Sequence, residues 1–256
     1  MTKLDRLIEI LCAERGEEVP ALSEREKSRY FRALVNVRMP KAASQEFLRL
    51  QDEYLQEQLR LKGITDIAEL VPVLADPDMY LWQGDITTLK CDGIVNAANS
   101  GMLGCFSPNH GCIDNAIHTF AGVQLRQECA AIMEAQGKEE PTGQAKITSG
   151  YNLPCKYVLH TVGPIVFGKL NERHEKLLGS CYRSCLALAD EKGLENLAFC
   201  CISTGEFRFP NERAAELAVQ TVSEYKRQTQ SSIKVIFNVF KDYDYEIYAR
   251  LLGKNK

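Results

Sequence analysis

Two cysteines and a histidine lie close together in a turn-rich segment of the sequence. Cys105, His110 and Cys112 fall within eight residues and would present two thiolates and an imidazole. This ligand set suits Zn²⁺ best among the common divalent ions. Structural zinc sites usually have four protein ligands, whereas catalytic sites leave one position for water or substrate. Three ligands therefore favour a metal centre that takes part in chemistry, and we expect zinc as the cofactor.

The same segment also has a purely structural interpretation. Free cysteines are among the most buried residue types, so Cys112 could be a small apolar residue at a helix start and Cys105 an incidental loop thiol. Asp114, two residues further on, could stabilise the first turn of a helix. As a functional carboxylate it would instead orient a water molecule or a sugar hydroxyl beside the metal. His118 lies on the same helix face and is predicted to be a packing residue rather than a ligand.

The composition is that of an ordinary soluble globular protein. The chain has 256 residues, of which 45% are hydrophobic and 25% charged. Its net charge of −3 gives no basic surface for nucleic acid or an anionic membrane. The first residues are too charged for a secretory signal, and no apolar run reaches the ~18 residues of a membrane span. We therefore expect a cytoplasmic protein that binds neither nucleic acid nor membrane, and whose ten cysteines are reduced.

The hydrophobic pattern divides the chain in two. Residues 1–70 are predicted to form an all-helical extension because apolar residues recur there at helical spacing. The segment from Val71 to Asp78 contains two prolines and breaks the pattern, so we place the boundary there. In residues 78–254, short β-branched or aromatic runs alternate with helical windows. This alternation predicts a three-layer α/β/α fold with a mixed, largely parallel central sheet.

The individual elements of the second part follow from the same pattern. The predicted strands are 79–83, 92–98, 143–150, 156–163, 196–204 and 233–240, and the predicted helices are 114–134, 172–192, 211–227 and 243–252. In such sheets ligands bind beyond the carboxyl ends of the strands. One loop at that edge carries the cysteines and the histidine. Another, residues 203–207, offers successive backbone N–H groups and a glycine, which suits a pyrophosphate, although a plain strand-to-helix turn uses the same residue types.

Five short motifs, in order along the chain, resemble the macrodomain family. They are GDIT at 84–87, VNAAN at 95–99, DNAIH at 114–118, HTVGP at 160–164 and ISTGEF at 202–207. The resemblance covers about residues 78–254 and implies a macrodomain that binds ADP-ribose. The insertion GCFSPNHGC at 104–112 and the all-helical extension resemble the zinc-dependent branch of the family, in which Cys105, His110 and Cys112 would bind the metal.

The resemblance implies a role for each matched residue on the nucleotide side. Asp85 would read the adenine, assisted by the backbone of Ile86, and Phe240 would stack on the ring. The diphosphate loop would be Ser203, Thr204, Gly205, Glu206 and Phe207. The ordinary alternative for Asp85 is that it caps a turn.

The resemblance also implies the residues around the distal ribose, the sugar that is attached to the modified protein. Asn96 and Asn99 would lie beside it, and Asp114 would activate water or hold its hydroxyls, with Asn99 and Asp114 as the catalytic pair. The alternative for Asn99 is that it favours a left-handed backbone conformation. The implied reaction is hydrolysis of the bond between C1 of that ribose and an acidic side chain, which reverses protein ADP-ribosylation.

The resemblance also implies partners for the protein, and two other functions compete with hydrolysis. Members of this branch are typically encoded beside sirtuins that ADP-ribosylate a lipoyl-carrier protein, so the resemblance implies such a protein as the substrate and ADP-ribose as the product. Two other functions stay open: a non-catalytic reader of ADP-ribose, and a deacetylase of O-acetyl-ADP-ribose. The helical extension could cover part of the sheet or contact the modified protein.

Overall fold

The chain begins with three amphipathic helices whose first turns are capped by side chains. These are α1 (Lys3–Ala13), α2 (Glu24–Val37) and α3 (Gln45–Lys62). At α1, the Thr2 hydroxyl accepts a hydrogen bond from the Asp5 N–H at 3.1 Å. At α3, the Ser44 hydroxyl accepts one from the Phe47 N–H at 3.1 Å. Such caps satisfy backbone donors that a helix start leaves unpaired. The expectation of an all-helical extension over residues 1–70 needs correction after Lys62, because the chain there leaves the helix and forms the short strand β1 (Thr65–Asp66).

The structure, a computed structural model, describes residues 2–253; residue 1 of the predicted extension and residue 254 of the predicted second part lie outside this range. Its main sheet has seven strands in the order β2-β3-β9-β8-β5-β7-β6. They are β2 (Pro72–Val73), β3 (Asp76–Gln83), β5 (Gly93–Ala98), β6 (Ala145–Ser149), β7 (Tyr157–Val162), β8 (Asn196–Phe199) and β9 (Lys234–Val239). The inner strands are parallel, and the edge strands β2 and β6 run antiparallel to their neighbours. The mixed, largely parallel sheet predicted from the sequence is confirmed.

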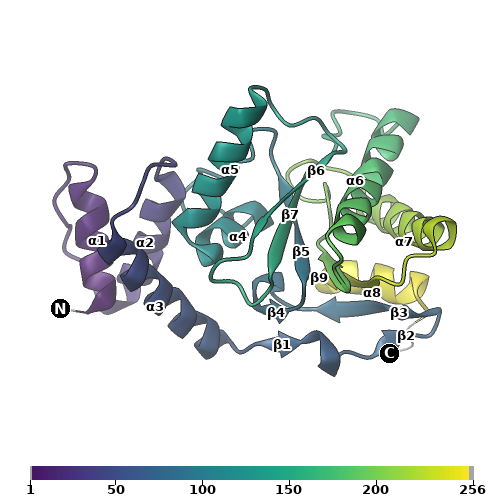
Figure 1. Ribbon diagram of the computed structural model, residues 1–256, viewed down its shortest axis with the longest axis horizontal. Coiled ribbons are helices and arrows are strands. Elements are labelled where there is room, and N and C mark those ends of the chain that lie inside the picture. Colours follow the sequence, from purple (N-terminus) through teal and green to yellow (C-terminus); the bar gives the residue numbers. More distant parts are fainter. Residues whose placement is uncertain (1, 254–256) are drawn as a thin grey trace.

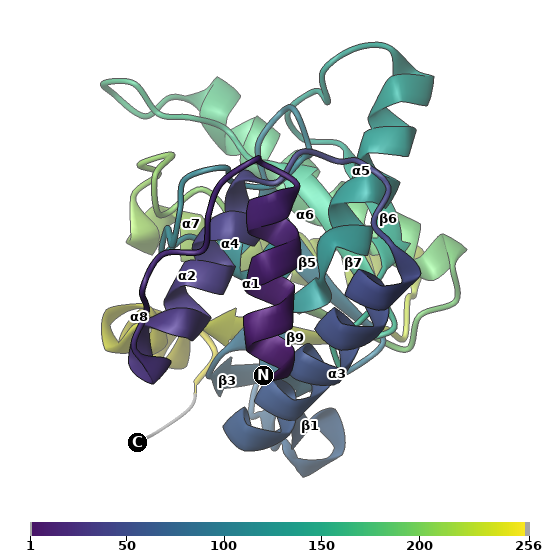
Figure 2. The same ribbon diagram turned by 90° about the vertical axis from the view of Figure 1, so that its left-hand side faces the viewer.

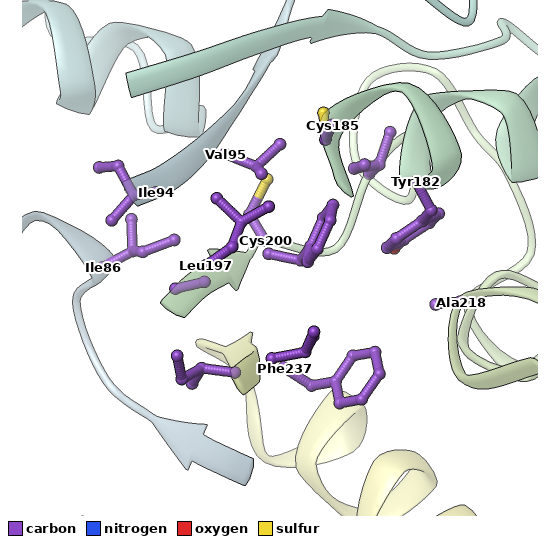
Figure 3. Close-up of a cluster of buried hydrophobic side chains, with 14 of the residues drawn as sticks. Ile86, Ile94, Val95, Tyr182, Cys185, Leu197, Cys200, Ala218 and Phe237 are labelled. Atoms are coloured by element: carbon purple, nitrogen blue, oxygen red, sulfur yellow. The ribbon is translucent and has the colours of Figure 1, made fainter. Parts of the chain in front are cut away.

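Helices cover both faces of this sheet, which gives the predicted three layers (Figure 1). One face carries α4 (Ile113–Ala121) and α5 (Val123–Gln136), and the other carries α6 (Glu172–Glu191), α7 (Asn211–Thr229) and α8 (Asp242–Leu251). The core between the layers contains aromatic and cysteine side chains such as Tyr182, Cys185, Cys200 and Phe237 (Figure 3). Cys185 and Cys200 are therefore core residues.

The predicted helix at 114–134 is wrong in one respect, because Gly122 divides it into α4 and α5. Gly122 has φ +97°, and a Cβ there would lie 2.6 Å from Nε2 of Gln51 on α3. A positive φ and this close approach both require glycine. The cause of the break is thus a contact from a distant part of the chain, which the local apolar pattern does not contain.

The segment between the two parts contains short elements that the sequence analysis did not predict. They are β1 (Thr65–Asp66), the 3-10 helix η1 (Ile67–Glu69) and the edge strand β2. β1 pairs with β4 (Leu89–Lys90), and Pro72 of β2 pairs with Tyr80 of β3. Proline is tolerated at the edge of a sheet because one side of an edge strand needs no N–H donor. The proline-containing segment therefore adds an edge strand, β2, to the sheet.

The helices α1 to α3, here called the helical unit, pack against the outer side of α4 and α5 (Figures 1 and 2). Their own apolar cluster includes Leu7, Phe31 and Phe47, and Val123 of α5 joins it. The part of the chain from β2 to α8 is here called the sheet domain. The helical unit thus covers two helices of the sheet domain rather than the sheet itself. Within residues 2–253, no helix is both long and apolar enough to cross a bilayer.

A buried arginine of the sheet domain holds the end of α2. One nitrogen of Arg126, Nη1, donates to the carbonyl oxygens of Val35, Asn36 and Arg38 at 3.1, 2.9 and 2.6 Å. Arg126 is only 5% exposed. The last carbonyls of a helix have no partner within the helix, so this guanidinium satisfies them from the neighbouring domain.

We expect Arg126→Leu to lower the free energy of unfolding by about 2–3 kcal/mol, because hydrogen bonds from a charged buried donor are lost. The measurement is urea denaturation followed by circular dichroism. The matched control is Arg29→Leu, a change on the exposed side of α2, with an expected effect within about 0.5 kcal/mol. An unchanged denaturation midpoint in Arg126→Leu would show that this contact does not stabilise the packing of the two parts.

Candidate metal centre and ligand site

The residues singled out in the sequence come from one edge of the sheet. Asp85 follows β3, Asn99 follows β5, Ser203 lies in the loop after β8, and Phe240 follows β9. These four strands are parallel to one another, so their carboxyl ends meet at the same edge. The topology therefore brings together side chains that are distant in sequence.

Cys105, His110 and Cys112 converge in front of α4. Their ligand atoms all lie within 4.8 Å of one another, and each side chain is half-buried. The Cys105 Sγ is 3.7 Å from the His110 Nδ1, close to the ~3.6 Å expected between a sulfur and a nitrogen on one tetrahedral Zn²⁺. No further His, Cys, Asp or Glu of residues 2–253 joins this group. The donor set and its spacing fit a zinc ion with three protein ligands.

The loop that carries these ligands depends on a glycine at its start. Gly104 has φ +79°, and a Cβ at this position would lie 2.7 Å from the ring of His118. The Gly104 carbonyl also accepts a hydrogen bond from the Asn99 amide at 3.1 Å. At the other end, Cys112 is the N-cap of α4, and its sulfur accepts from the Asn115 N–H at 3.4 Å. The chain thus enters the loop beside Asn99 and leaves it as a helix.

Asp114 lies in the first turn of α4 and is 5% exposed. Its two oxygens accept hydrogen bonds from the side-chain amides of Asn96 and Asn99, at 2.8 and 3.3 Å. Burial raises the pKa of Asp114 to about 6, although the two amides and the charge of Arg126 favour the carboxylate. Desolvation therefore outweighs the hydrogen bonds at this carboxyl group. A pKa shifted by burial is common among functional acids and bases.

Asn96 and Asn99, which are both expected beside the ribose, differ in exposure and in hydrogen-bond partners. Asn96 is fully buried, and its amide nitrogen lies between Asp114 and Nδ1 of His160, at 2.8 and 3.1 Å. Without exposed surface it acts on a ligand only through Asp114. Asn99 is half-buried. Its Nδ2 donates both to Asp114 and to the carbonyl of Gly104, the first residue of the loop 104–112 that carries the predicted metal ligands and is here called the metal loop.

Two buried histidines lie behind Asp114, and neither was predicted to have a role in the site. His118 and His160, with Cys129, place their ligand atoms within 4.8 Å of one another, and all three side chains are buried. Burial lowers the pKa of His160 to about 3 and holds that of His118 well below its ordinary value. Neither ring nitrogen of His118 has a hydrogen-bond partner among residues 2–253. The prediction that His118 is a packing residue needs this correction: it is buried, but its polar atoms are not satisfied.

Asp85, the predicted adenine-reading residue, caps the 3-10 helix η2 (Ile86–Thr88). One carboxylate oxygen accepts from the Thr87 N–H and hydroxyl at 3.0 and 2.6 Å, and the other from Nζ of Lys62 at 2.9 Å. Burial opposes the charge, but these hydrogen bonds outweigh it, so the pKa of Asp85 lies below its ordinary value. The side chain of Ile86 is buried. The turn-capping interpretation of Asp85 is confirmed, and its carboxylate stays at the ligand-binding edge.

Phe240 presents an uncovered ring at the same edge. Its side chain is 74% exposed directly after β9. The amide of Gln83, two residues before Asp85, lies 3.4 Å from the Phe240 carbonyl and donates to Asp242 at 2.7 Å. An exposed aromatic ring near a polar carboxylate suits a flat heterocycle that carries an amino group.

The loop at 203–207 is shaped by a strained backbone and by a glycine opposite. The strand β8 ends at Phe199, earlier than predicted, and Ser203 has φ +68°. Ser203 is buried, and its hydroxyl has no partner among the described residues. A Cβ at Gly163 would lie 2.0 Å from that hydroxyl, so only glycine allows the loop to pack here. Thr204 donates to the Cys201 carbonyl at 3.1 Å.

The loop at 203–207 meets the loop with the predicted metal ligands at His110. Glu206 is exposed, and its Oε1 lies 3.6 Å from Nε2 of His110. On the far side, the Phe207 carbonyl accepts from the Val166 N–H at 2.9 Å. The predicted diphosphate loop and the predicted metal ligands are therefore neighbours, although about a hundred residues separate them in the sequence.

Comparison with known proteins agrees with this geometry. The Macro domain family matches residues 95–218. A protein of Treponema medium named protein-ADP-ribose hydrolase is 56% identical over 262 aligned positions, which cover 99% of this chain and 100% of that protein. The chain belongs to the macrodomain family. A Staphylococcus aureus protein of the same name is 52% identical to this macrodomain over 88% of the chain and 84% of its own length.

Solved macrodomains share the fold at lower identity. A Trypanosoma brucei macrodomain in complex with ADP-ribose has a TM-score of 0.65 and 28% identity, and the match covers 99% of this chain and 96% of that one. A mutant Oceanobacillus iheyensis macrodomain with ADPR has a TM-score of 0.63 and 38% identity, over 68% of this chain and 91% of its own. The trypanosome match therefore extends over the helical unit of this macrodomain as well as its sheet domain.

The site of this macrodomain also contains side chains from the helical unit, which no motif indicated. Lys62 of α3 bonds Asp85, as described above, and its Nζ lies 3.4 Å from the ring centre of Phe120. Arg32 of α2 reaches the metal loop. The helical unit thus contacts the site both at Asp85 and at the backbone of His110.

Proposed function

We propose that this macrodomain is a zinc-dependent hydrolase that releases ADP-ribose from acidic side chains of modified proteins. The observation that carries the proposal is the convergence of three side chains that could bind a metal, Cys105, His110 and Cys112, two residues before the buried carboxylate of Asp114. The hydrolase class is supported by relatives named protein-ADP-ribose hydrolase that are 56% and 52% identical over 99% and 88% of the chain.

The nucleotide part of the ligand would bind along the edge that runs from Phe240 to the metal loop. Phe240 and Asp85 would contact the adenine, and the backbone of residues 203–207 the diphosphate. This order is supported by the geometry, since Phe240 and Asp85 lie at the ends of β9 and β3 and Glu206 lies beside His110. The distal ribose then falls next to Asn99 and Asp114.

The reaction adds water across the bond between C1 of the distal ribose and the carboxyl oxygen of the acceptor. The leaving oxygen gains the proton, and the products are ADP-ribose and the free acidic side chain. A bound zinc ion would supply Lewis-acid stabilisation of charge that develops on oxygen. Asp114, held by two amide donors, would accept a hydrogen bond from the water or a ribose hydroxyl and so orient it. Asn99 would fix the carboxylate and the start of the metal loop together.

The substrate and the compartment are part of the proposal. The resemblance to the zinc-dependent branch supports a lipoyl-carrier protein modified by a sirtuin as the substrate. An acidic chain of net charge −3 whose ten cysteines are all unpaired supports a location in the cytoplasm.

The decisive experiment measures release of ADP-ribose from a carboxylate-modified protein, with the enzyme as purified, after chelation and after zinc is returned. We expect turnover to be lost on chelation and restored by zinc. Binding of ADP-ribose without turnover in all three samples would identify a reader instead. Faster turnover of O-acetyl-ADP-ribose than of the modified protein would identify a deacetylase.

Glu206 provides a separate prediction, because a carboxylate in a diphosphate loop repels its ligand. Its Oε1 lies 3.6 Å from Nε2 of His110. This is too long for a hydrogen bond, but a carboxylate beside the outer nitrogen of a metal-binding histidine favours one orientation of the ring. We expect Glu206→Gln to weaken zinc binding about tenfold and to leave ADP-ribose binding equal or tighter. Competition with a chelator and calorimetry measure the two. Weaker ADP-ribose binding with unchanged zinc affinity would contradict this role.

A further inference from the structure

We propose that Arg32 and Asn36 of α2 are positioning residues for the metal loop, residues 104–112, and that the helical unit thereby gives the metal centre its affinity for zinc. The inference rests on the proposed zinc site and adds to it the role of a part of the chain that carries none of the predicted ligands.

Arg32 binds the loop and its anchor at once. Its Nη2 donates to the carbonyl oxygen of His110 at 3.1 Å and to Oδ1 of Asn115 at 2.7 Å, and its Nε donates to the same Oδ1 at 3.2 Å. Hydrogen bonds from a charged donor are stronger than neutral ones. The guanidinium is half-buried, so water competes less for these contacts. Arg32 therefore fixes the backbone of one metal ligand directly.

Asn115 passes this constraint to the two cysteines. Its side chain has no exposed surface, and the contact with Arg32 fixes its oxygen toward α2. Its Nδ2 then faces the loop, where it lies 3.0 Å from the Ser107 carbonyl and 3.5 Å from the Cys105 carbonyl. Its backbone N–H donates to the Cys112 sulfur at 3.4 Å. All three ligand residues are thus tied to Arg32, one directly and two through Asn115.

Asn36, one helical turn after Arg32, holds the loop at a second point. It is 1% exposed, and its Oδ1 accepts from the backbone N–H of Asn109 at 2.9 Å. Its Nδ2 donates to the Thr119 hydroxyl of α4 at 2.9 Å, which fixes the amide orientation. Asn109 has φ +55°, a conformation that costs energy unless its surroundings hold it. The residue before His110 is therefore pinned between α2 and α4.

A zinc ion that binds a mobile loop must order its backbone, and this ordering weakens the observed affinity. Fixing the backbone of one residue costs about 1–2 kcal/mol, and the metal loop has no helix or strand of its own. Contacts that hold the ligands in place before the metal arrives reduce this cost at the binding step. Partners of metal ligands typically change metal affinity by about 10- to 100-fold when they are removed.

The test is the zinc dissociation constant of the full chain, measured by competition with a chromophoric chelator. We expect Arg32→Met to raise it about 10- to 100-fold and Asn36→Ser about tenfold, with ADP-ribose binding unchanged. Excess zinc should restore turnover in both variants, which a general loss of structure would not allow. Arg29→Met is the matched control: it removes the same group from the same helix at an exposed position and should bind zinc like the original chain.

Three outcomes separate the possibilities. Variants that hold zinc as tightly as the original chain would overturn the inference and leave the zinc-dependent hydrolase intact. An original chain without zinc affinity would overturn both. If Arg32→Met fails to fold, Arg32→Lys decides, because it keeps the charge but loses the forked contact; zinc affinity equal to that of the original chain would then count against the proposal, and weaker binding would support it.

Discussion

Cys112→Ala is expected to reduce the release of ADP-ribose about 100- to 1,000-fold, the usual loss when a group that stabilises charge on oxygen is removed. Only one sulfur and one imidazole would remain to bind zinc, which is too few for a stable centre. The measurement combines the initial rate on a carboxylate-modified protein with metal analysis of the purified variant. Both should fall together, while ADP-ribose binding through Asp85 and the diphosphate loop persists.

The matched control is Cys155→Ala, which removes the same atom from a buried thiol outside the metal group. This variant should keep both zinc and turnover. A Cys112→Ala variant that lacks zinc but turns over at the original rate would show that the metal only braces the loop.

Asp114→Asn is expected to lower kcat about 100- to 10,000-fold, the range for the loss of a general acid or base, with zinc content retained. The substitution keeps the shape of the side chain and one oxygen for the Asn96 amide, but it removes the negative charge that would orient water or a ribose hydroxyl. Steady-state rates at several substrate concentrations separate kcat from KM, and the main change should be in kcat.

Asp92→Asn is the control for this substitution. Asp92 is also a buried carboxylate, but it precedes β5 at the opposite edge of the sheet and accepts from the Glu195 N–H at 2.8 Å. Its replacement should affect stability and leave kcat unchanged. An unchanged kcat in Asp114→Asn would show that the carboxylate only stabilises the first turn of the helix.

The location of the site at the carboxyl edge of the sheet could be predicted from the sequence, because it depends on local hydrophobic patterns and on one topological rule. The change of hydrophobic period after residue 78 located the strands, and the rule for parallel sheets selected the loop with the cysteines and the loop at 203–207. The roles of Asp85 and Asn99 came from the resemblance to macrodomains. The grouping of Cys105, His110 and Cys112 was predictable because the three lie in one short loop, where chain connectivity already limits their separation.

Other features depend on contacts that no local pattern contains. Arg32 and Asn115 are 83 positions apart, so neither carries a signal for the other. Asn96 and Asn99 look alike in the sequence, and only the buried interior of β5 separates their roles. The break at Gly122 likewise follows from the approach of Gln51, since the apolar pattern runs through it without interruption.

The position of Arg126 has a consequence for any shortened version of this protein. If the chain were cut to begin at residue 78, Phe120 and Val123 would lose their cover, and a buried cation would lose its three carbonyl acceptors. The surface of the sheet domain under the helical unit is therefore apolar and carries a buried cation. The two parts therefore stabilise each other, and we expect a fragment without the helices to unfold at a lower urea concentration than the full chain.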